Sequence, residues 1–114
     1  MSKGDLGYFT IPIRDLKRGR TFYSGLFGWE FVNEVSSDSY AHVGNTNPAG
    51  GLHVNEAVSP QVWFKVEDIK AASARVRELG GHAGEPQHSA SGWNSACRDD
   101  QGTQFNLWQP APGY

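Results

Sequence analysis

The sequence predicts an α+β fold built from two βαβββ modules. Three observations support this: an alternating apolar run at residues 8–13, an amphipathic segment at residues 16–27, and a second copy of both further along the chain. Ile11 and Ile13 alternate with less apolar neighbours, as in a half-buried strand. Asp15 directly precedes the amphipathic segment, which is typical of a helix N-cap. Together these features predict a strand followed at once by a helix.

The same pattern recurs 53 positions later. The shift places Asp15 on Asp68 and Gly28 on Gly81, with the apolar strand and helix positions also in register. A repeat that occurs only twice is too infrequent for a solenoid, so it indicates two similar modules packed as a pseudo-twofold pair. We expect a curved mixed sheet that forms a cup, with the helices outside.

In the first module, residues 7–55, turn-forming clusters separate the expected elements. Gly28 is expected to end the helix in a left-handed conformation, and apolar residues of the helix lie on one stripe that includes Tyr23, Leu26 and Phe27. The expected elements are a strand at 8–13, a helix at 16–27, and strands at 29–34, 40–44 and 51–55.

A linker at residues 56–60 leads to the second module, residues 61–110, within a single domain that spans residues 1–114. Asp68 is the expected N-cap of its helix, and Gly81 is expected to terminate it. The expected elements are a strand at 62–66, a helix at 69–79, strands at 82–85, 94–98 and 103–109, and a polar loop at 88–93.

Composition narrows the class of protein. The net charge of −2 gives no basic footprint, so we do not expect a nucleic-acid partner. No apolar run approaches the length of a membrane span, so no membrane partner is expected either. Cys97 is the single cysteine, which suits a reducing cytoplasm. Open sheet edges and a shallow cup lead us to expect a homodimer.

Three stretches resemble the vicinal oxygen chelate superfamily, which includes glyoxalase I, bleomycin-resistance proteins and extradiol dioxygenases. They are IPIRDLKRGRTFYSGLFGWEF in the first module, FKVEDIKAASARVRELGG in the second, and the terminal DDQGTQFNLWQP. The resemblance covers nearly the whole chain and implies paired βαβββ modules around a ligand cup, often in a dimer. It does not specify a reaction, because function in such folds depends on the residues of the cup.

Strand alternation predicts which side chains line that cup. Residues that alternate with the helix-facing apolar set should face inward. The predicted ligand-binding residues are Tyr8, Thr10, Tyr40, His42, His53, Gln61, Trp63, Asn106 and Trp108. This aromatic and polar lining suits a planar or amphipathic small molecule. Trp63 and Trp108 either stack on that ligand or fill the cup themselves.

The resemblance also predicts where a metal would be held. In metal-dependent members, four ligands, mostly His and Glu, come from the first and last strands of each module. The matching positions are Tyr8, His53, Gln61 and Asn106. Among them His53 alone is a typical ligand, whereas a catalytic metal site usually has about three His or carboxylate ligands. We therefore expect no metal ligand set and no cofactor.

Two functions follow from these residues. The first is a binding protein that holds a planar or aromatic small molecule without a metal, as antibiotic-sequestering members of the superfamily do. The second is a glyoxalase-like lyase, isomerase or dioxygenase with a divalent metal as Lewis acid. In a metal-free variant of the enzyme, His53 is the candidate catalytic residue and acts as general base. The composition of the cup favours the binding protein.

Overall fold

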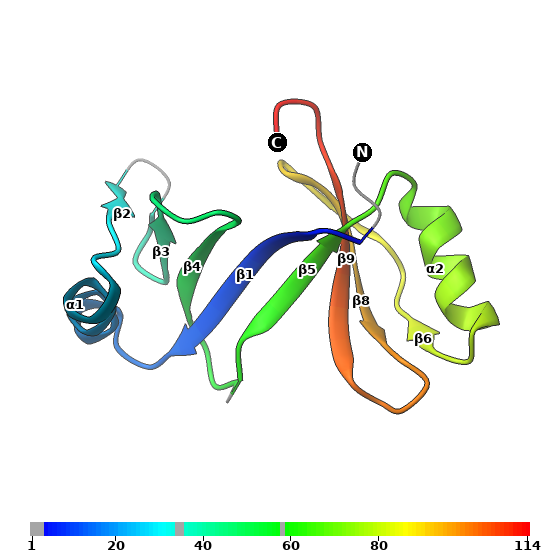
Figure 1. The fold of residues 1–114 in the computed structure, drawn as a ribbon, viewed down its shortest axis with the longest axis horizontal. Coiled ribbons are helices and arrows are strands. Elements are labelled where there is room, and N and C mark those ends of the chain that lie inside the picture. Colours follow the sequence, from blue (N-terminus) through cyan, green and yellow to red (C-terminus); the bar gives the residue numbers. More distant parts are fainter. Residues whose placement is uncertain (1–3, 34–35, 58) are drawn as a thin grey trace. The chain divides into compact units, whose positions relative to one another are not determined.

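The structure is a computed structural model that describes residues 4–33, 36–57 and 59–114. The chain divides into two compact units. The first unit is Tyr8–Gln61, and the second joins the N-terminal residues up to Gly7 to Val62–Tyr114. Each unit carries one helix and several strands, which confirms the predicted α+β class (Figure 1). Neither helix is long and apolar enough to cross a membrane, in the part of the chain that the structure describes.

The first unit has the predicted order of elements. They are β1 (Leu6–Ile13, from Tyr8 onward), α1 (Leu16–Phe27), β2 (Phe31–Val32), β3 (Tyr40–Val43) and β4 (Ala49–Val54). The strands lie in the order β2-β3-β4-β1. The β1–β4 pair is parallel and the other two pairs are antiparallel. The module is therefore βαβββ. Strand β2 is shorter than the expected 29–34, of which Glu34 lies outside the described residues.

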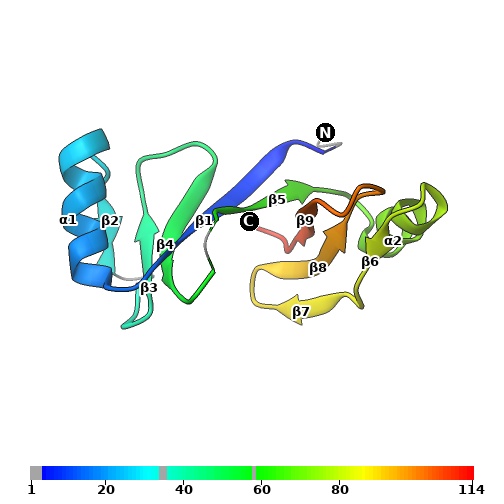
Figure 2. The ribbon, with the colours of Figure 1, turned by 90° about the horizontal axis from the view of Figure 1, so that it is seen from below.

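Helix α1 packs on β3 and β4 through a glycine contact (Figure 2). A Cβ atom placed on Gly19 would lie 3.2 Å from both Ile13 Cδ1 and Leu52 Cδ1, so the helix backbone approaches the sheet closely. Beneath the helix, Ala41 and Leu52 are fully buried. This face of the sheet is the core of the first unit, as the alternation of apolar residues predicts.

The apolar stripe predicted for α1 is only partly correct. Leu26 and Phe27 are 59% and 58% exposed, whereas Tyr23 is half-buried. The helix meets the sheet around Gly19, so the end of the stripe projects beyond the strands. There Phe27 packs against the Trp29 ring, with 5.1 Å between the ring centroids.

Both helices begin at the aspartates that the repeat predicts. The Asp15 Oδ1 atom accepts a hydrogen bond from the Arg18 backbone N–H (2.9 Å), and Asp68 caps α2 in the same way. Gly28 ends α1 with a φ of 72°, as expected. In the second module the prediction of Gly81 was wrong by one residue, because Gly80 has the positive φ of 93°.

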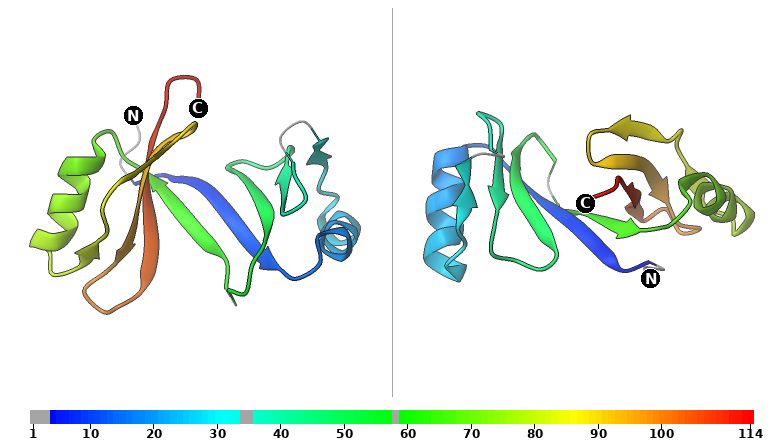
Figure 3. Two further views of the ribbon diagram at one scale, coloured as in Figure 1. Left: turned by 180° about the vertical axis from the view of Figure 1, so that it is seen from behind. Right: turned by 90° about the horizontal axis from the view of Figure 1, so that it is seen from above.

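The second unit follows the same plan with one additional strand. Its elements are β5 (Gln61–Lys65, from Val62 onward), α2 (Ile69–Glu78), β6 (His82–Ala83), β7 (Gln87–Ser89), β8 (Gly92–Arg98) and β9 (Gln104–Pro110). The strands lie in the order β5-β9-β8-β6, and β7 pairs with β8 (Figure 3). The polar loop expected at 88–93 is therefore a β-hairpin, because His88 pairs with Trp93 across a tight turn.

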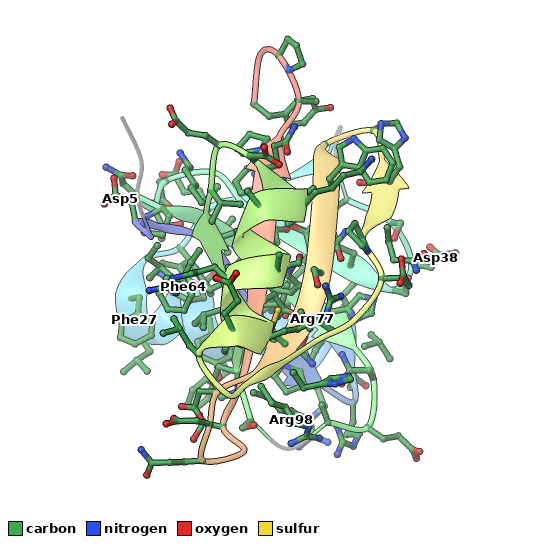
Figure 4. The ribbon with its side chains drawn as sticks, turned by 90° about the vertical axis from the view of Figure 1, so that its right-hand side faces the viewer. Asp5, Phe27, Asp38, Phe64, Arg77 and Arg98 are labelled. Carbon is green, nitrogen blue, oxygen red and sulfur yellow. The ribbon has the colours of Figure 1, made fainter. Side chains whose placement is uncertain are left out.

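A small apolar core joins α2 to its sheet. Ile69, Ala83, Cys97 and Leu107 are buried together in this core. Figure 4 shows α2 in front of the sheet with Arg77 beside it, and the Arg77 Nη2 atom donates to the Ala83 carbonyl (3.0 Å). Helix α2 thus covers one face of the β9–β8 pair, and the alternate residues of β9 lie on the opposite face.

Candidate functional site

The face of the first unit opposite α1 carries the predicted site residues of this unit's strands. The surroundings of two adjacent glycines distinguish the face that packs on α1 from the opposite face. A side chain on Gly50 would meet the Phe9 ring on the helix side, whereas one on Gly51 would meet the Tyr40 ring on the other side. The register places Thr10 and His42 on either side of Gly51. The strand-4 register that positions His53 is also settled, since His53 pairs with Tyr40 and Pro12.

A hydrogen-bonded chain of three side chains dominates this face. The Tyr40 hydroxyl bonds to the Tyr8 hydroxyl and lies 2.9 Å from His42 Nδ1. The ring of Tyr40 covers Gly51, which lacks the side chain that would displace it. Burial raises the pKa of Tyr8 to about 12 and lowers the pKa of His42. At neutral pH Tyr8 is therefore a neutral phenol and His42 a neutral imidazole.

His53 lies next to this chain and is exposed. Its ring centroid is 6.4 Å from that of Tyr40, and its Nδ1 atom is 2.9 Å from Asn55 Nδ2. The Asn55 Oδ1 atom accepts a hydrogen bond from the Ala57 backbone N–H (2.7 Å). The amide is therefore oriented with its nitrogen toward the imidazole. Action of His53 as a general base at Nδ1 requires this bond to Asn55 to break.

The second unit carries three further predicted residues. Trp63 pairs with Asn106, and Trp108 with Lys65, across the parallel β5–β9 pair. All four side chains alternate with Phe64 and the buried Leu107, so they share the face opposite α2. The Lys65 Nζ atom lies 5.9 Å from the centroid of the Trp108 ring, within cation–π range.

Hydrogen bonds fix two of these side chains in place. The Trp108 indole N–H donates to the Ser91 carbonyl (3.0 Å), and Asn106 Nδ2 donates to the Val62 carbonyl (3.1 Å). Both residues are half-buried, whereas Gln61, assigned to the first unit, is exposed at the start of β5. The Trp108 ring is thus held by the turn between β7 and β8, and the Asn106 amide by β5.

The side chains at the predicted metal positions do not fit a divalent metal. Tyr8 is a neutral phenol that bonds to another hydroxyl, and Asn106 offers only a neutral amide oxygen. Gln61 adds a neutral amide, which leaves His53 as the one strong donor of the set. Across residues 4–33, 36–57 and 59–114, no three His, Cys, Asp or Glu side chains form a group that could hold a metal ion.

The chain belongs to the glyoxalase-like domain family, whose model matches residues 8–108. This match covers most of the chain and confirms the predicted membership of the vicinal oxygen chelate superfamily. No curated protein sequence matches the chain significantly.

Solved structures share the fold at low sequence identity. Methylmalonyl-CoA epimerase from Mycobacterium tuberculosis aligns with a TM-score of 0.71 at 20% identity, over 97% of this chain and 90% of the epimerase. A hypothetical protein from Bacillus halodurans C-125 aligns with a TM-score of 0.75 at 14% identity, over 99% and 97% of the two chains. A variant of Streptomyces coelicolor methylmalonyl-CoA epimerase in complex with 2-nitronate-propionyl-CoA aligns with a TM-score of 0.70 at 19% identity, over 96% and 99%. These likenesses establish the fold.

Two residues that strand alternation turns to these faces were not among the predicted ligand contacts. Asn55 orients His53, and Lys65 lies over Trp108. The alternation of the strands places Lys65 on the predicted inner face, so the signal was present for it. Asn55 is the last residue of the expected strand at 51–55, so alternation also turned it inward, although the observed β4 ends at Val54. Its orientation of His53 depends on a hydrogen bond with the Ala57 backbone N–H, which no sequence pattern indicates.

Proposed function

We propose that this protein binds a planar or aromatic small molecule and needs no divalent metal to do so. The observation that carries the proposal is the hydrogen-bonded chain of Tyr8, Tyr40 and His42 on the helix-free face of the first unit. Aromatic surface and neutral polar groups are held there in fixed positions. Such a surface favours stacking and hydrogen bonding over metal chemistry.

The second unit supports the same proposal. Trp63 and Trp108 lie on a face of its sheet that α2 does not cover, with Asn106 beside Trp63 in the register. Indole rings offer a large flat surface to a planar ligand, and the Asn106 Oδ1 atom remains an acceptor while its amide nitrogen donates to Val62. We keep these three residues, with Thr10 and Gln61, as proposed ligand contacts.

The test is a titration of tryptophan fluorescence with a panel of planar molecules that includes benzoate and acetophenone. A saturable change is expected in the native protein, and Trp63→Ala or Trp108→Ala should abolish it while the circular dichroism spectrum stays native. Trp29→Phe is the control, because Trp29 packs against Phe9 and Tyr23 on the helix side and should leave binding unchanged. Equal affinity in the native protein and both alanine variants would contradict the stacking role.

Elemental analysis separates this proposal from a metal-dependent lyase, isomerase or dioxygenase. The protein is purified from medium supplemented with Ni, Zn, Mn and Fe and then dialysed. A stoichiometric metal that survives dialysis would overturn the metal-free proposal, and His53→Ala should then abolish turnover. Metal at background level, together with saturable binding of a planar molecule, is the expected result.

Two further proposals concern the setting of the protein. We propose a homodimer, since β2 and β6 end the two sheet orders and a second copy can cover their open edges. A monomer by light scattering at micromolar concentration would contradict this. We also propose a cytoplasmic location, on the basis of the single reduced cysteine, Cys97.

A further inference from the structure

We propose that the first unit recognises an oxygen acceptor on its ligand, such as a carbonyl, carboxylate or enolate group, through the Nε2–H groups of His42 and His53. This inference rests on the proposed function, because it specifies the chemistry of the small molecule bound on the same face. It differs from the earlier expectation for His53, in which that imidazole accepts a proton as a general base.

The hydrogen bonds around His53 determine its tautomer. The Ala57 backbone N–H donates to Asn55 Oδ1 (2.7 Å), so the amide oxygen is already committed to that contact. The Asn55 nitrogen, a donor, then lies 2.9 Å from His53 Nδ1. A neutral imidazole has one donor and one acceptor nitrogen. Because Nδ1 accepts from Asn55, the proton of neutral His53 lies on Nε2.

His42 reaches the same tautomer through a different partner. Its Nδ1 atom lies 2.9 Å from the Tyr40 hydroxyl. An imidazole nitrogen is a stronger acceptor than a phenol oxygen, and a phenol is a stronger donor than an imidazole N–H, so Tyr40 donates to Nδ1. With its proton donated to Nδ1, the Tyr40 oxygen is left to accept from the Tyr8 hydroxyl. The proton of neutral His42 therefore also lies on Nε2.

Burial of the site keeps this arrangement in place at neutral pH. Desolvation lowers the pKa of His42, so its ring is neutral, and it raises the pKa of Tyr8 to about 12, so that phenol keeps its proton. The neutral imidazole thus keeps one acceptor nitrogen, and the neutral phenol keeps a proton to donate, as donation from Tyr8 through Tyr40 to His42 requires.

The two N–H donors lie on one face and flank one ring. The Tyr40 centroid is 6.0 Å from that of His42 and 6.4 Å from that of His53. Within the described part of the chain, no group bonds to either Nε2 atom. A ligand with an oxygen acceptor can accept hydrogen bonds from these N–H groups. A ligand that has only donors would place its own N–H against them and leave both unpaired. We expect a preference of about tenfold for the acceptor ligand for each N–H that it engages.

The first arm of the test reads the tautomers without any ligand. Long-range ¹H–¹⁵N spectra of the imidazole rings at neutral pH should show Nε2 protonated and Nδ1 unprotonated for both His42 and His53. His82 and His88 are exposed, and their ring nitrogens make no hydrogen bond to a described residue, so they serve as internal references with averaged tautomers. A protonated Nδ1 on either site histidine would overturn the inference, whatever the ligand results.

Asn55→Asp provides a matched reversal. The aspartate keeps an oxygen for the Ala57 N–H and presents its second oxygen, an acceptor, to His53 Nδ1. His53 should then move its proton to Nδ1, while His42 keeps its proton on Nε2. Unchanged tautomers in this variant would show that Asn55 does not set the state of His53.

The second arm measures affinity for three planar probes by NMR titration. Benzoate is an anionic acceptor, acetophenone is a neutral acceptor, and indole is a donor without an oxygen acceptor. Benzoate and acetophenone should bind about tenfold more tightly than indole, and Asn55→Asp should reduce that ratio for acetophenone, whose lack of charge excludes a simple charge effect. Tighter binding of indole would overturn this inference and leave the proposed function standing. Absence of saturable binding by all three probes would overturn both.

Discussion

Replacement of Tyr40 by phenylalanine tests whether the hydroxyl chain stabilises the fold. The substitution keeps the ring that covers Gly51 and removes only the oxygen. That oxygen bonds to the Tyr8 hydroxyl and to His42 Nδ1, and it lies 3.5 Å from the Gly50 carbonyl, which is too long to count strongly. Two effective hydrogen bonds are therefore lost, and two polar groups lose a partner.

The expected loss of stability in Tyr40→Phe follows from those two hydrogen bonds. A typical intramolecular hydrogen bond contributes about 0.5–1.5 kcal/mol net, so the pair is worth about 1–3 kcal/mol. Tyr8, Tyr40 and His42 are all half-buried, and water can replace part of the lost bonding, which places the expected loss in the lower half of that range. The free energy of unfolding, measured by urea titration, should fall by about 1–2 kcal/mol with an unchanged m-value.

A matched control and a double mutant complete this test. Tyr23→Phe removes a hydroxyl that bonds to no described residue and keeps the ring stacked 5.2 Å from Trp29, so it should change stability by less than about 0.5 kcal/mol. Because Tyr8 and Tyr40 share one bond, the double variant Tyr8→Phe/Tyr40→Phe should lose less than the sum of the single variants. Strict additivity, or a loss in Tyr40→Phe no larger than in Tyr23→Phe, would refute the reasoning.

Three further predictions follow from the same face. Ultraviolet titration of the tyrosinate signal should show a phenol that ionises near pH 12 and is absent in Tyr8→Phe; ionisation of every tyrosine near pH 10 would contradict it. Burial lowers the pKa of His42, so the folded state binds fewer protons there than the unfolded chain, and stability should decrease as the pH falls below about 6.5, less steeply in His42→Gln. Gly51→Ala places a methyl group 2.6 Å from Tyr40 Cζ and should lower the free energy of unfolding by about 1–3 kcal/mol. Gly25 has open space around it, so Gly25→Ala should stabilise α1 by up to about 1 kcal/mol. Equal thermal melting temperatures of the two variants would be evidence against this packing.

The internal repeat explains why so much of the fold could be predicted from the sequence. Asp15 and Asp68 cap their helices where the repeat places them, because an aspartate before an apolar-periodic run has one dominant local use. Alternation in the strands also assigned the faces correctly, as the burial of Leu52 and Leu107 on the helix sides shows. Each of these features depends on a few consecutive residues, which is the range over which sequence patterns carry information.

The errors occurred where particular contacts, rather than the periodicity of the sequence, decide the structure. The hairpin of β7 and β8 forms between segments of weak apolar character, and the pairing of His88 with Trp93 overrides their polar composition. The exposure of Phe27 depends on how closely Gly19 brings α1 to the sheet, which no periodicity in the helix reveals. In the site, the sequence placed Tyr40 and His42 on one face but could not show their hydrogen bond.

The hydroxyl chain gives a physical reason for proposing a site that works without a metal. A metal ligand set needs several anionic or imidazole donors that converge on one point, and it is stabilised by the charge of the ion. In the first unit, Tyr8 stands at one of the predicted ligand positions. Its hydroxyl forms a hydrogen bond with the Tyr40 hydroxyl. Its raised pKa means that phenolate formation, which metal binding would require, is opposed by the same burial that keeps His42 neutral. These contacts support the proposal that the ligand is recognised by neutral hydrogen bonds and supplies an oxygen acceptor.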